Sequence, residues 1–242
     1  LISFISRFFK KIITGILMSL QSKSRKVKYN LFYKKNLESK LNKVDKLNMG
    51  AGDYIITGWL NIGIYSEDDI RWGTVKEKNG ALIMNYNINY DIPIKTNSIK
   101  YIYSSHMIEH LNFNDGIKFL EKCYKILKKD GIIRLVFPDL QLWVKNYYES
   151  NNEFFIQYYN HTMSINELPE LKTNGEIFMS QIYNWGHNWG YDYDSIKDIL
   201  QRSGFKDIKR MAFHESQIPN IMEIEPDIEE RKLESIYVEV KK

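Results

Sequence analysis

Cysteine and uninterrupted apolar runs are what this 242-residue sequence has least of. Its one cysteine, Cys123, excludes an intramolecular disulfide framework and a zinc site made of several cysteines. A reducing, cytoplasmic setting is the simplest fit to that count. Near the N-terminus, Arg7, Lys10 and Lys11 interrupt the apolar residues. The apolar run is therefore shorter than the roughly 20 residues that a membrane-spanning helix needs.

Length and composition indicate one globular domain with an appendage. A chain of 242 residues is rather short for two full domains, and 43% hydrophobic with 26% charged residues is an ordinary globular composition. The charge is unevenly distributed. Residues 1–46 carry 12 basic and 2 acidic residues, a net +10, whereas the remainder carries 22 basic and 28 acidic residues, a net −6. The acidic body argues against nucleic-acid binding, and the basic arm predicts an anionic partner.

The basic arm, residues 1–45, begins with the stretch LISFISRFFKKIITGILMSL. Its apolar residues fall at helical spacing and its basic residues on the other side, which predicts an amphipathic helix over residues 1–20. Such a helix could lie on an anionic membrane surface, peripheral to the inner face of the membrane. Packing on the rest of the domain, or on a second copy in a homodimer, is an equally good alternative. A signal peptide is less favoured, because no small-residue cleavage site follows.

Residues 46–242 predict a domain of the α/β class, because short apolar strands alternate with amphipathic helices. This alternation is typical of a doubly wound, mainly parallel sheet, whose ligand binds at the carboxyl ends of the strands. Residues 140 to about 190 break the pattern; they are rich in aromatic residues and asparagine and indicate an insertion over those strand ends. The expected strands are residues 47–49, 59–62, 81–86, 101–103, 132–137, 206–213 and 235–241; the expected helices are 114–127, begun by Asn114 or Asp115 and stopped by residues 128–131, and 194–203.

A glycine turn follows the first expected strand, in the stretch NMGAGDYIITGWLNIG. Gly50 and Gly52 would let the backbone approach a ligand closely, because no Cβ stands in the way. The third glycine of the dinucleotide-binding fingerprint is absent, which disfavours NAD and favours a smaller nucleoside ligand. An ordinary turn is the alternative, since two glycines near a strand end are a weak signal.

A histidine motif follows the fourth expected strand, in the stretch SSHMIEHL. The spacing His106-x-x-Glu109-His110 matches the inverted signature of zinc proteases, in which two histidines one turn apart bind the metal. The match is short, and the sequence offers no obvious third ligand. We therefore expect no metal site and favour a helix start whose histidine and glutamate pair locally; a metal-dependent hydrolase stays as a hypothesis.

Five segments of the body occur in a fixed order: LNMGAGDYIITGWLNIG, IPIKTNSIKYIYSSHMIEHL, FLEKCYKILKKDGIIRLVFPDL, GHNWGYDYDSIKDILQRSGFKDIKR and ESIYVEVKK. Together they resemble the class I S-adenosylmethionine-dependent methyltransferases, and among these the small methyltransferases encoded with surface polysaccharide genes. The resemblance covers residues 46–242. It implies a seven-stranded sheet with an antiparallel last strand at residues 235–241, and S-adenosylmethionine as the cofactor. It also implies O-methylation of a saccharide or lipid-linked glycan, with a glycan or small molecule as the acceptor.

The resemblance also assigns roles to particular residues. It would place the methionine part of the cofactor over the glycine turn, the ribose at the end of the second strand, the adenine before residues 92–94, and the sulfonium above the histidine motif. Histidine is the preferred base for a hydroxyl acceptor, because its ordinary pKa lies near neutrality. The implied cofactor residues are Gly50, Ala51, Gly52, Ile62, Gly63, Asn87, Ile88, Ser105 and His106, with His110 beside them; the implied catalytic residues are His187, His110 and Asp139.

Two implied cofactor contacts depart from the family pattern. An acid usually binds the ribose hydroxyls and another accepts from the adenine amino group, but this chain has Gly63 and Asn87 there. Asn87 still offers a carbonyl oxygen, whereas losing charge-assisted hydrogen bonds at Gly63 would cost about 1.5–3 kcal/mol. An acid among residues 67–69 could compensate. A degenerate methyltransferase fold that serves as a binding or assembly module is therefore the alternative function.

An aromatic segment near the end of the insertion could stack against a sugar ring, although most aromatic clusters belong to protein cores. Its members are Tyr183, Trp185, Trp189, Tyr191 and Tyr193.

Overall fold

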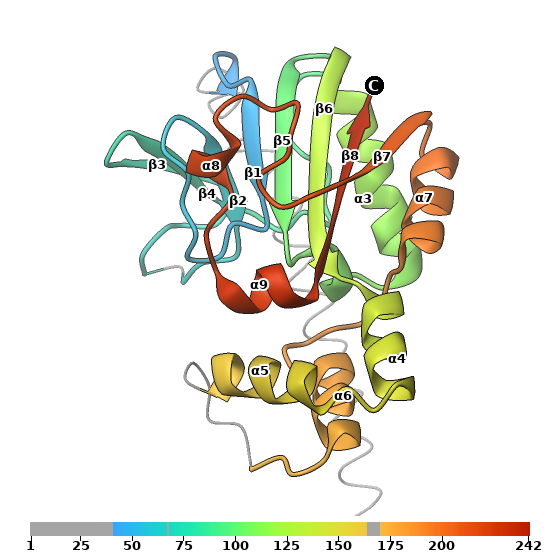
Figure 1. Cartoon of the computed structure of the whole chain (residues 1–242). Helices are drawn as coiled ribbons and strands as arrows, with labels where there is room; N and C mark the ends of the chain where they lie inside the picture. Colours follow the sequence, from blue (N-terminus) through green and yellow to red (C-terminus); the bar gives the residue numbers. More distant parts are fainter. Residues whose placement is uncertain (1–40, 67, 164–169) are drawn as a thin grey trace, which may run out of the picture. The chain divides into compact units, whose positions relative to one another are not determined.

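A computed structural model describes residues 41–66, 68–163 and 170–242 of the chain (Figure 1). Residues Val44–Lys242 form one compact unit. The amphipathic helix expected over residues 1–20 lies outside the described residues. Within the described ranges, no helix is both long and apolar enough to cross a lipid bilayer.

An eight-stranded sheet runs through the unit in the order β3-β4-β2-β1-β5-β6-β8-β7. Strands β4, β2, β1, β5 and β6 pair in parallel with their neighbours in that order, while β8 runs antiparallel to both β6 and β7. The doubly wound α/β fold with an antiparallel last strand is thus confirmed. The strands are β1 Lys46–Met49, β2 Leu60–Gly63, β3 Val75–Lys78, β4 Ala81–Asn85, β5 Ile99–Ser105, β6 Leu127–Pro138, β7 Asp207–Met211 and β8 Ser235–Lys241.

Strand β3 makes the sheet eight-stranded, where the sequence predicts seven strands. It pairs antiparallel with β4 through the two-residue turn Asn79-Gly80, whose φ angles are 51° and 75°. A two-residue hairpin turn with positive φ at both positions favours asparagine followed by glycine, so the Asn79-Gly80 pair indicates a hairpin in the sequence itself. The strand was missed because VKEK lies at the sheet edge with three exposed residues, and therefore has no alternating apolar pattern.

Helices α3 (Phe113–Ile126) and α7 (Tyr193–Arg202) pack beside the sheet (Figure 1). The N-cap of α3 is Asn112, whose side chain accepts a hydrogen bond from the Asp115 backbone N–H, so the expected start at residue 114 or 115 is wrong. The expected stop at residues 128–131 is also wrong. The helix ends at Ile126, and β6 begins at once with Leu127. Residues 128–131 have turn-forming side chains but belong to the first, irregular part of β6. The pairing of β5 with β6 shifts register there.

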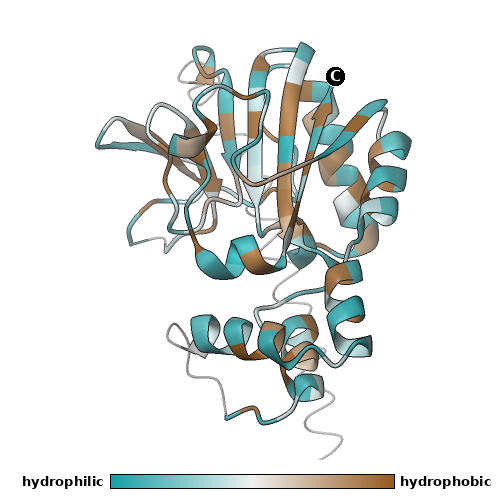
Figure 2. Cartoon of the chain, viewed as in Figure 1, coloured by the Kyte–Doolittle hydropathy of each residue, from teal (hydrophilic) through white to brown (hydrophobic). Residues whose placement is uncertain are grey.

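The sheet carries the main core. Its central strands are buried on both faces, and Ile196, Ile199 and Leu200 of α7 face inward as expected. Figure 2 shows hydrophobic residues along these strands and hydrophilic residues on the outer sides of α3 and α7. One cluster on the sheet consists of Ile56, Trp59, Tyr103, Ile132, Val136, Ile218, Ile221, Ile224 and Tyr237. The two short helices near the C-terminus are α8 (Ile221–Ile224) and α9 (Glu229–Glu234).

Three helices occupy the region expected as an insertion: α4 (Leu140–Tyr148), α5 (Asn152–Met163) and α6 (Asn174–Tyr183). They lie beyond the carboxyl ends of the parallel strands (Figure 1). Trp143 is buried at the centre of their own aromatic core, with ring centroids 4.9 Å from Phe154 and 4.6 Å from Tyr158. Much of the aromatic content of this region therefore serves packing.

A buried arginine, Arg134, stands in the middle of β6. Its guanidinium donates to both carboxylate oxygens of Glu225 at 2.9 and 2.8 Å and to Glu239 at 3.2 Å. The carbonyls of Ala212 and Glu215 accept its other N–H groups at 3.1 and 2.8 Å. These two carboxylates surround one guanidinium in a fully hydrogen-bonded cluster, which we call the arginine cluster.

Candidate functional site

The glycine turn joins β1 to the loop before β2. The backbone N–H groups of Gly50 and Ala51 both donate to the carbonyl of Ile62, at 2.8 and 2.9 Å. Gly50 has a φ of 75°, and a Cβ built there would lie 2.1 Å from Cγ of Met107. Glycine is therefore required at position 50 by the packing of the protein itself, whatever ligand the turn meets.

A hollow of about 340 Å³ opens beside this turn. Gly52 faces open space, because a Cβ there would have no described atom within 4 Å. Three expected cofactor residues do not line the hollow: Ala51 and Ile62 are buried, and Ser105 accepts a hydrogen bond from Arg231 at 3.1 Å. The hollow is lined by Gly50, Gly52, Gly63, Ile64, Tyr86, Asn87, Ile88, Asn89, His106, Met107, His110 and Leu111.

Tyr65 occupies the space that a side chain at Gly63 would take. A Cβ built on Gly63 would lie 2.9 Å from the Tyr65 hydroxyl oxygen. That oxygen is buried without a hydrogen-bond partner in the described part of the chain. Burial, with a smaller contribution from Asp53, raises the pKa of Tyr65 to about 12. A neutral hydroxyl therefore stands next to position 63. Asp68 and Asp69, expected to compensate, are exposed, and Glu67 lies outside the described residues.

Asn87 lies in the hollow with part of its hydrogen-bonding capacity used. Its side-chain oxygen accepts from the backbone N–H of Asn89 at 2.9 Å. The second lone pair of that oxygen and the amide N–H groups stay available to a ligand.

The histidine motif lies directly beyond β5, where Ile108–His110 form the short 3-10 helix η2. His106 has a positive φ of 48°, which bends the chain sharply between the strand and η2. Its Nε2 lies 2.8 Å from the Ser235 hydroxyl, and its Nδ1 lies 3.5 Å from Glu109. Burial, followed by the charges of Arg231, His187 and His110, holds the pKa of His106 well below its ordinary value.

Backbone hydrogen bonds fasten the segment after α6 to η2. The Glu109 carbonyl accepts from the N–H groups of Asn188 and Trp189, at 2.8 and 3.0 Å. The Asn188 side chain also donates to the carbonyl of His110 at 2.8 Å. This attachment brings His187 to the motif, and the ring centroids of His110 and His187 lie 5.0 Å apart.

Glu109, His110 and His187 offer three ligand atoms within 4.8 Å of one another. The sequence offered no third ligand for the motif; the structure supplies His187, and His106 lies outside this trio. Burial lowers the pKa of both His110 and His187. The Nδ1 of His187 lies 2.6 Å from the carbonyl of Gln181. A carbonyl only accepts, so Nδ1 carries the proton and Nε2 keeps its lone pair.

Glu109 is the buried carboxyl of this trio, which we call the Glu109 cluster. Its exposed fraction is 2%, and neither carboxyl oxygen has a hydrogen-bond partner among the described residues. Burial raises its pKa to about 8, partly offset by the nearby backbone N–H of Glu109 itself and by the charge of Arg231. The sequence motif included Glu109, but its isolation only becomes visible in three dimensions.

Three hollows meet at the Glu109 cluster. His106 and His110 line both the glycine-turn hollow and a second one of about 210 Å³. His187 lines the second hollow and a third of about 410 Å³, to which Glu109 also belongs. The third hollow has an aromatic and apolar lining, including Trp143, Phe178, Tyr183 and Trp189. The cluster thus lies between the glycine turn and a separate binding space.

Asp139, expected at the acceptor, is engaged elsewhere. It is buried, caps α4 through the N–H of Gln141 at 3.1 Å, and pairs with Arg210 at 2.8 Å. It does not line any of the three hollows. Both carboxylate oxygens therefore make structural contacts, and Asp139 is not placed to accept a proton from a ligand in any of these hollows.

The aromatic segment divides into lining and core residues. Tyr183 and Trp189 line the third hollow and Trp185 the second. Tyr191 is buried in the core, and the Tyr193 hydroxyl donates to the carbonyl of Ile208 at 3.2 Å.

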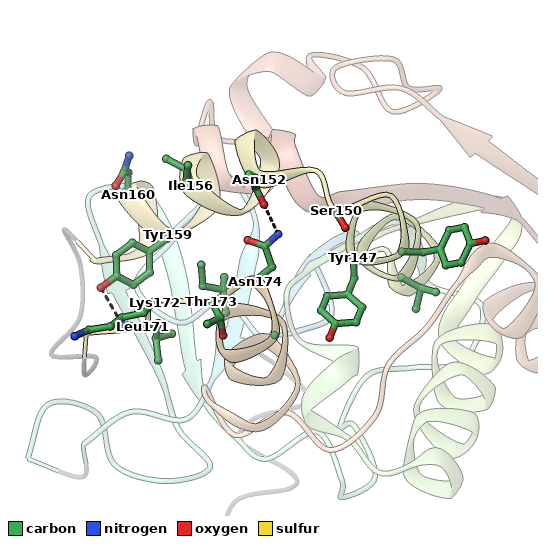
Figure 3. Close-up of a pocket in the computed structure, with 14 residues that line it drawn as sticks. Tyr147, Ser150, Asn152, Ile156, Tyr159, Asn160, Leu171, Lys172, Thr173 and Asn174 are labelled. Carbon is green, nitrogen blue, oxygen red and sulfur yellow. Dashed lines mark hydrogen bonds between the residues drawn. The ribbon is translucent and has the colours of Figure 1, made fainter.

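A wide hollow of about 1080 Å³ lies within helices α4 to α6 and the segment before α6 (Figure 3). Its edges are tied by hydrogen bonds from Asn174 to Asn152 at 2.7 Å and from the Leu171 N–H to the Tyr159 hydroxyl at 3.2 Å. It shares no lining residue with the other three hollows. It is therefore a separate feature of the insertion.

Sequence reasoning missed Tyr65, Gln181 and Arg231, which surround the site. Tyr65 follows Gly63 by two residues, and its bulk next to a glycine was a readable signal. Gln181 and Arg231 reach the histidines from distant helices, and no local spacing connects them to the motif.

Comparisons with known proteins found the following similarities. The model of a family described as a methyltransferase domain matches residues 66–135, which include β5 and the histidine motif. The sequence matches none of the curated proteins. Similar solved structures include an S-adenosylmethionine-dependent methyltransferase from Archaeoglobus fulgidus, at 13% identity and a TM-score of 0.47, covering 86% of this chain and 94% of that chain. Another, from Thermotoga maritima, has 15% identity and a TM-score of 0.46, covering 93% and 96%.

Proposed function

We propose that this chain is an S-adenosylmethionine-dependent methyltransferase that binds its cofactor in the glycine-turn hollow. The observation that carries the proposal is this hollow, formed at the carboxyl ends of parallel strands beside the segment that matches a methyltransferase domain. Ligands of doubly wound folds bind at those strand ends. The methionine part would pass over Gly50 and Gly52, and the adenine would lie beside Asn87 and Ile88.

The acceptor is a saccharide or a lipid-linked glycan of the kind used in surface polysaccharides, methylated on oxygen. The third hollow supports this proposal, because Tyr183 and Trp189 line it and are 72% and 45% exposed. Exposed aromatic faces suit the apolar faces of sugar rings, whereas core aromatics such as Tyr191 do not offer them.

The chemistry is an in-line displacement, in which alignment of donor and acceptor supplies much of the rate. The acceptor hydroxyl attacks the methyl carbon while the bond from carbon to sulfur breaks, and the hydroxyl proton must leave. His110 and His187 lie between the cofactor hollow and the third hollow, so the proton is lost at the Glu109 cluster. Asp139 has no part in this step.

The basic arm would hold the enzyme at the cytoplasmic face of an anionic membrane, close to a lipid-linked acceptor. This part of the proposal rests on the net charge of +10 over residues 1–46. Flotation with vesicles that contain anionic lipid, compared with neutral vesicles, measures that attachment directly.

Isothermal titration of S-adenosylmethionine into the purified chain tests the proposed cofactor. We expect binding that Asn87→Ala weakens about tenfold, equivalent to about 1.4 kcal/mol. Asn160→Ala is the matched control, because Asn160 is exposed and lines the wide hollow instead. An absence of binding by the unaltered chain, or equal binding by both variants, would contradict the proposed site. Mass spectrometry for a co-purified adenosyl cofactor gives an independent readout.

A further inference from the structure

We propose that Glu109, His110 and His187 bind a divalent transition-metal ion. Two imidazoles and one carboxylate form a donor set that zinc and related metals use in catalytic sites, with a further coordination position left open. Their ligand atoms already lie within 4.8 Å of one another. Metal bonds of about 2.0–2.2 Å place ligand atoms about 3.4 Å apart in a tetrahedral site, so the side chains would move closer together on binding.

The strongest evidence for a bound metal ion is the environment of the Glu109 carboxyl group. It is 2% exposed, and neither oxygen has a hydrogen-bond partner in the described ranges. An unpaired carboxyl group in such surroundings is costly, and native proteins rarely leave one without a purpose. The nearest basic group is His106 Nδ1 at 3.5 Å, which is too far for a hydrogen bond. A bound cation would give both oxygens a partner.

A hydrogen bond to a backbone carbonyl holds His187 in the form that can bind a metal. Metal-binding histidines commonly donate their second ring N–H to a carbonyl, which fixes the tautomer and orients the ring. The Nδ1 of His187 has this relation to the Gln181 carbonyl at 2.6 Å, which leaves Nε2 as the donor atom for a metal. On the other side, the N–H groups of Asn188 and Trp189 clamp the Glu109 backbone.

The donor types indicate which metals fit. Magnesium and calcium prefer sites made almost wholly of oxygen ligands. Imidazole with carboxylate suits zinc, manganese, iron and cobalt. A site with three protein ligands keeps an open position, and here that position would be reachable from the hollows that His110 and His187 line.

The role of the metal rests on the proposed methyltransferase function. The acceptor hydroxyl would bind the metal from the third hollow, and the metal would lower the pKa of that hydroxyl. Because His110 and His187 are then metal ligands, the proton of the metal-bound hydroxyl passes to a solvent water and to neither histidine. The oxygen then forms a bond to the methyl carbon, the bond from carbon to sulfur breaks, and its electron pair stays on sulfur. The products are a methyl ether and S-adenosylhomocysteine, so no external oxidant or reductant is needed.

Metal titration tests the site without cofactor or acceptor. The full chain is treated with a chelator, exchanged into clean buffer and titrated with Zn²⁺ by calorimetry and with Co²⁺ by visible absorption. We expect one ion per chain. Glu109→Gln and His187→Gln should each lower affinity more than about 100-fold, since even losing an outer-shell partner costs 10–100-fold. His161→Gln, on α5 and outside the cluster, is the matched control.

The outcomes separate this inference from the proposed function. Circular dichroism melting confirms that each variant is folded before its affinity is compared. Absence of stoichiometric Zn²⁺ and Co²⁺ binding, or equal affinity in Glu109→Gln and His161→Gln, overturns the metal site even if S-adenosylmethionine binds. Stoichiometric metal binding that needs Glu109 and His187 supports the site even if S-adenosylmethionine does not bind, in which case only the proposed function fails.

Discussion

The arginine cluster and the Glu109 cluster are two groups of buried ionisable side chains in the same domain, and they are built in opposite ways. Around Arg134, both carboxylates and the guanidinium are matched by hydrogen bonds from side chains and backbone. In the Glu109 cluster, the carboxyl oxygens have no such bonds within the described residues. A buried charge that is fully matched contributes to the fold. A buried carboxyl group without hydrogen-bond partners is available to a ligand.

The largest expected effect comes from breaking the matched cluster. Arg134→Met would leave Glu225 and Glu239 buried without their partner, which costs about 3–5 kcal/mol of unfolding free energy. Urea denaturation measures the loss. Arg202→Met is the control, because Arg202 and its ion-pair partner Asp198 are 52% and 61% exposed, and such a pair should contribute about 1 kcal/mol or less. Equal losses in the two variants would mean that the arginine cluster is no more structural than a surface pair.

The same kind of substitution in the other cluster should act in the opposite direction. Glu109→Met removes an unmatched buried group and keeps its volume, so in chelator the unfolding free energy should stay unchanged or rise by about 1–3 kcal/mol. Methyl transfer should fall at least about 100-fold. Glu225→Met serves as the matched control and should destabilise the protein like Arg134→Met. A large loss of stability in Glu109→Met would show that Glu109 is a structural residue.

A third substitution, with a smaller expected loss of unfolding free energy, tests whether burial explains the large contribution of the arginine cluster to stability. Asp192 is matched but only half-buried: it caps α7 by accepting from the Ser195 N–H at 2.8 Å. Asp192→Ala should cost about 1 kcal/mol at pH 7, measured by urea denaturation. Hydrogen bonds from the Ser195 side chain and backbone lower the pKa of Asp192. Its contribution is therefore present above its unfolded pKa of about 3.9 and is lost as the pH falls through the lower folded pKa.

Asp192→Asn is the control for that pH dependence. Asparagine caps helices about as well as aspartate, so most of the stability should remain, without a change across this pH range. If the difference in unfolding free energy between Asp192→Ala and the unaltered chain did not change with pH, the negative charge of Asp192 would contribute nothing, and only its hydrogen bond would matter.

The fold could be predicted largely from sequence, because it depends on local apolar patterns. The inward face of α7 and the presence of the strand Ser235–Lys241 follow from such patterns, whereas the antiparallel direction of that strand was implied by the family resemblance. Strand β3 could not be found that way, since Val75–Lys78 is an exposed edge strand. The start of α3 was misplaced because Asn112, Asn114 and Asp115 are all plausible caps, and only the backbone decides among them.

The site could be predicted only in part. Residues whose backbone or position decides their role, such as Gly52 and Asn87, lie in the expected hollow. Side-chain direction at a strand end depends on neighbouring elements, which is why Ser105 turns to Arg231 and Asp139 to Arg210. The proximity of Glu109 and His187 could not be anticipated, because Glu109 lies on η2 and His187 lies in the segment after α6, far away in the sequence.

The clamp of Asn188 on η2 has a consequence for the order of folding. Its side chain donates to the carbonyl of His110, which is 78 residues away in the chain. Bringing together two residues so far apart in the chain costs conformational entropy, because the loop between them must close. Contacts of high sequence separation therefore tend to form late in folding. The strands on either side of the glycine turn can assemble while the intervening chain is still being made. The trio of Glu109, His110 and His187 forms only when helices α4 to α6 have been synthesised and the chain has returned to the sheet. A nascent chain would therefore form its glycine turn well before the Glu109 cluster is complete.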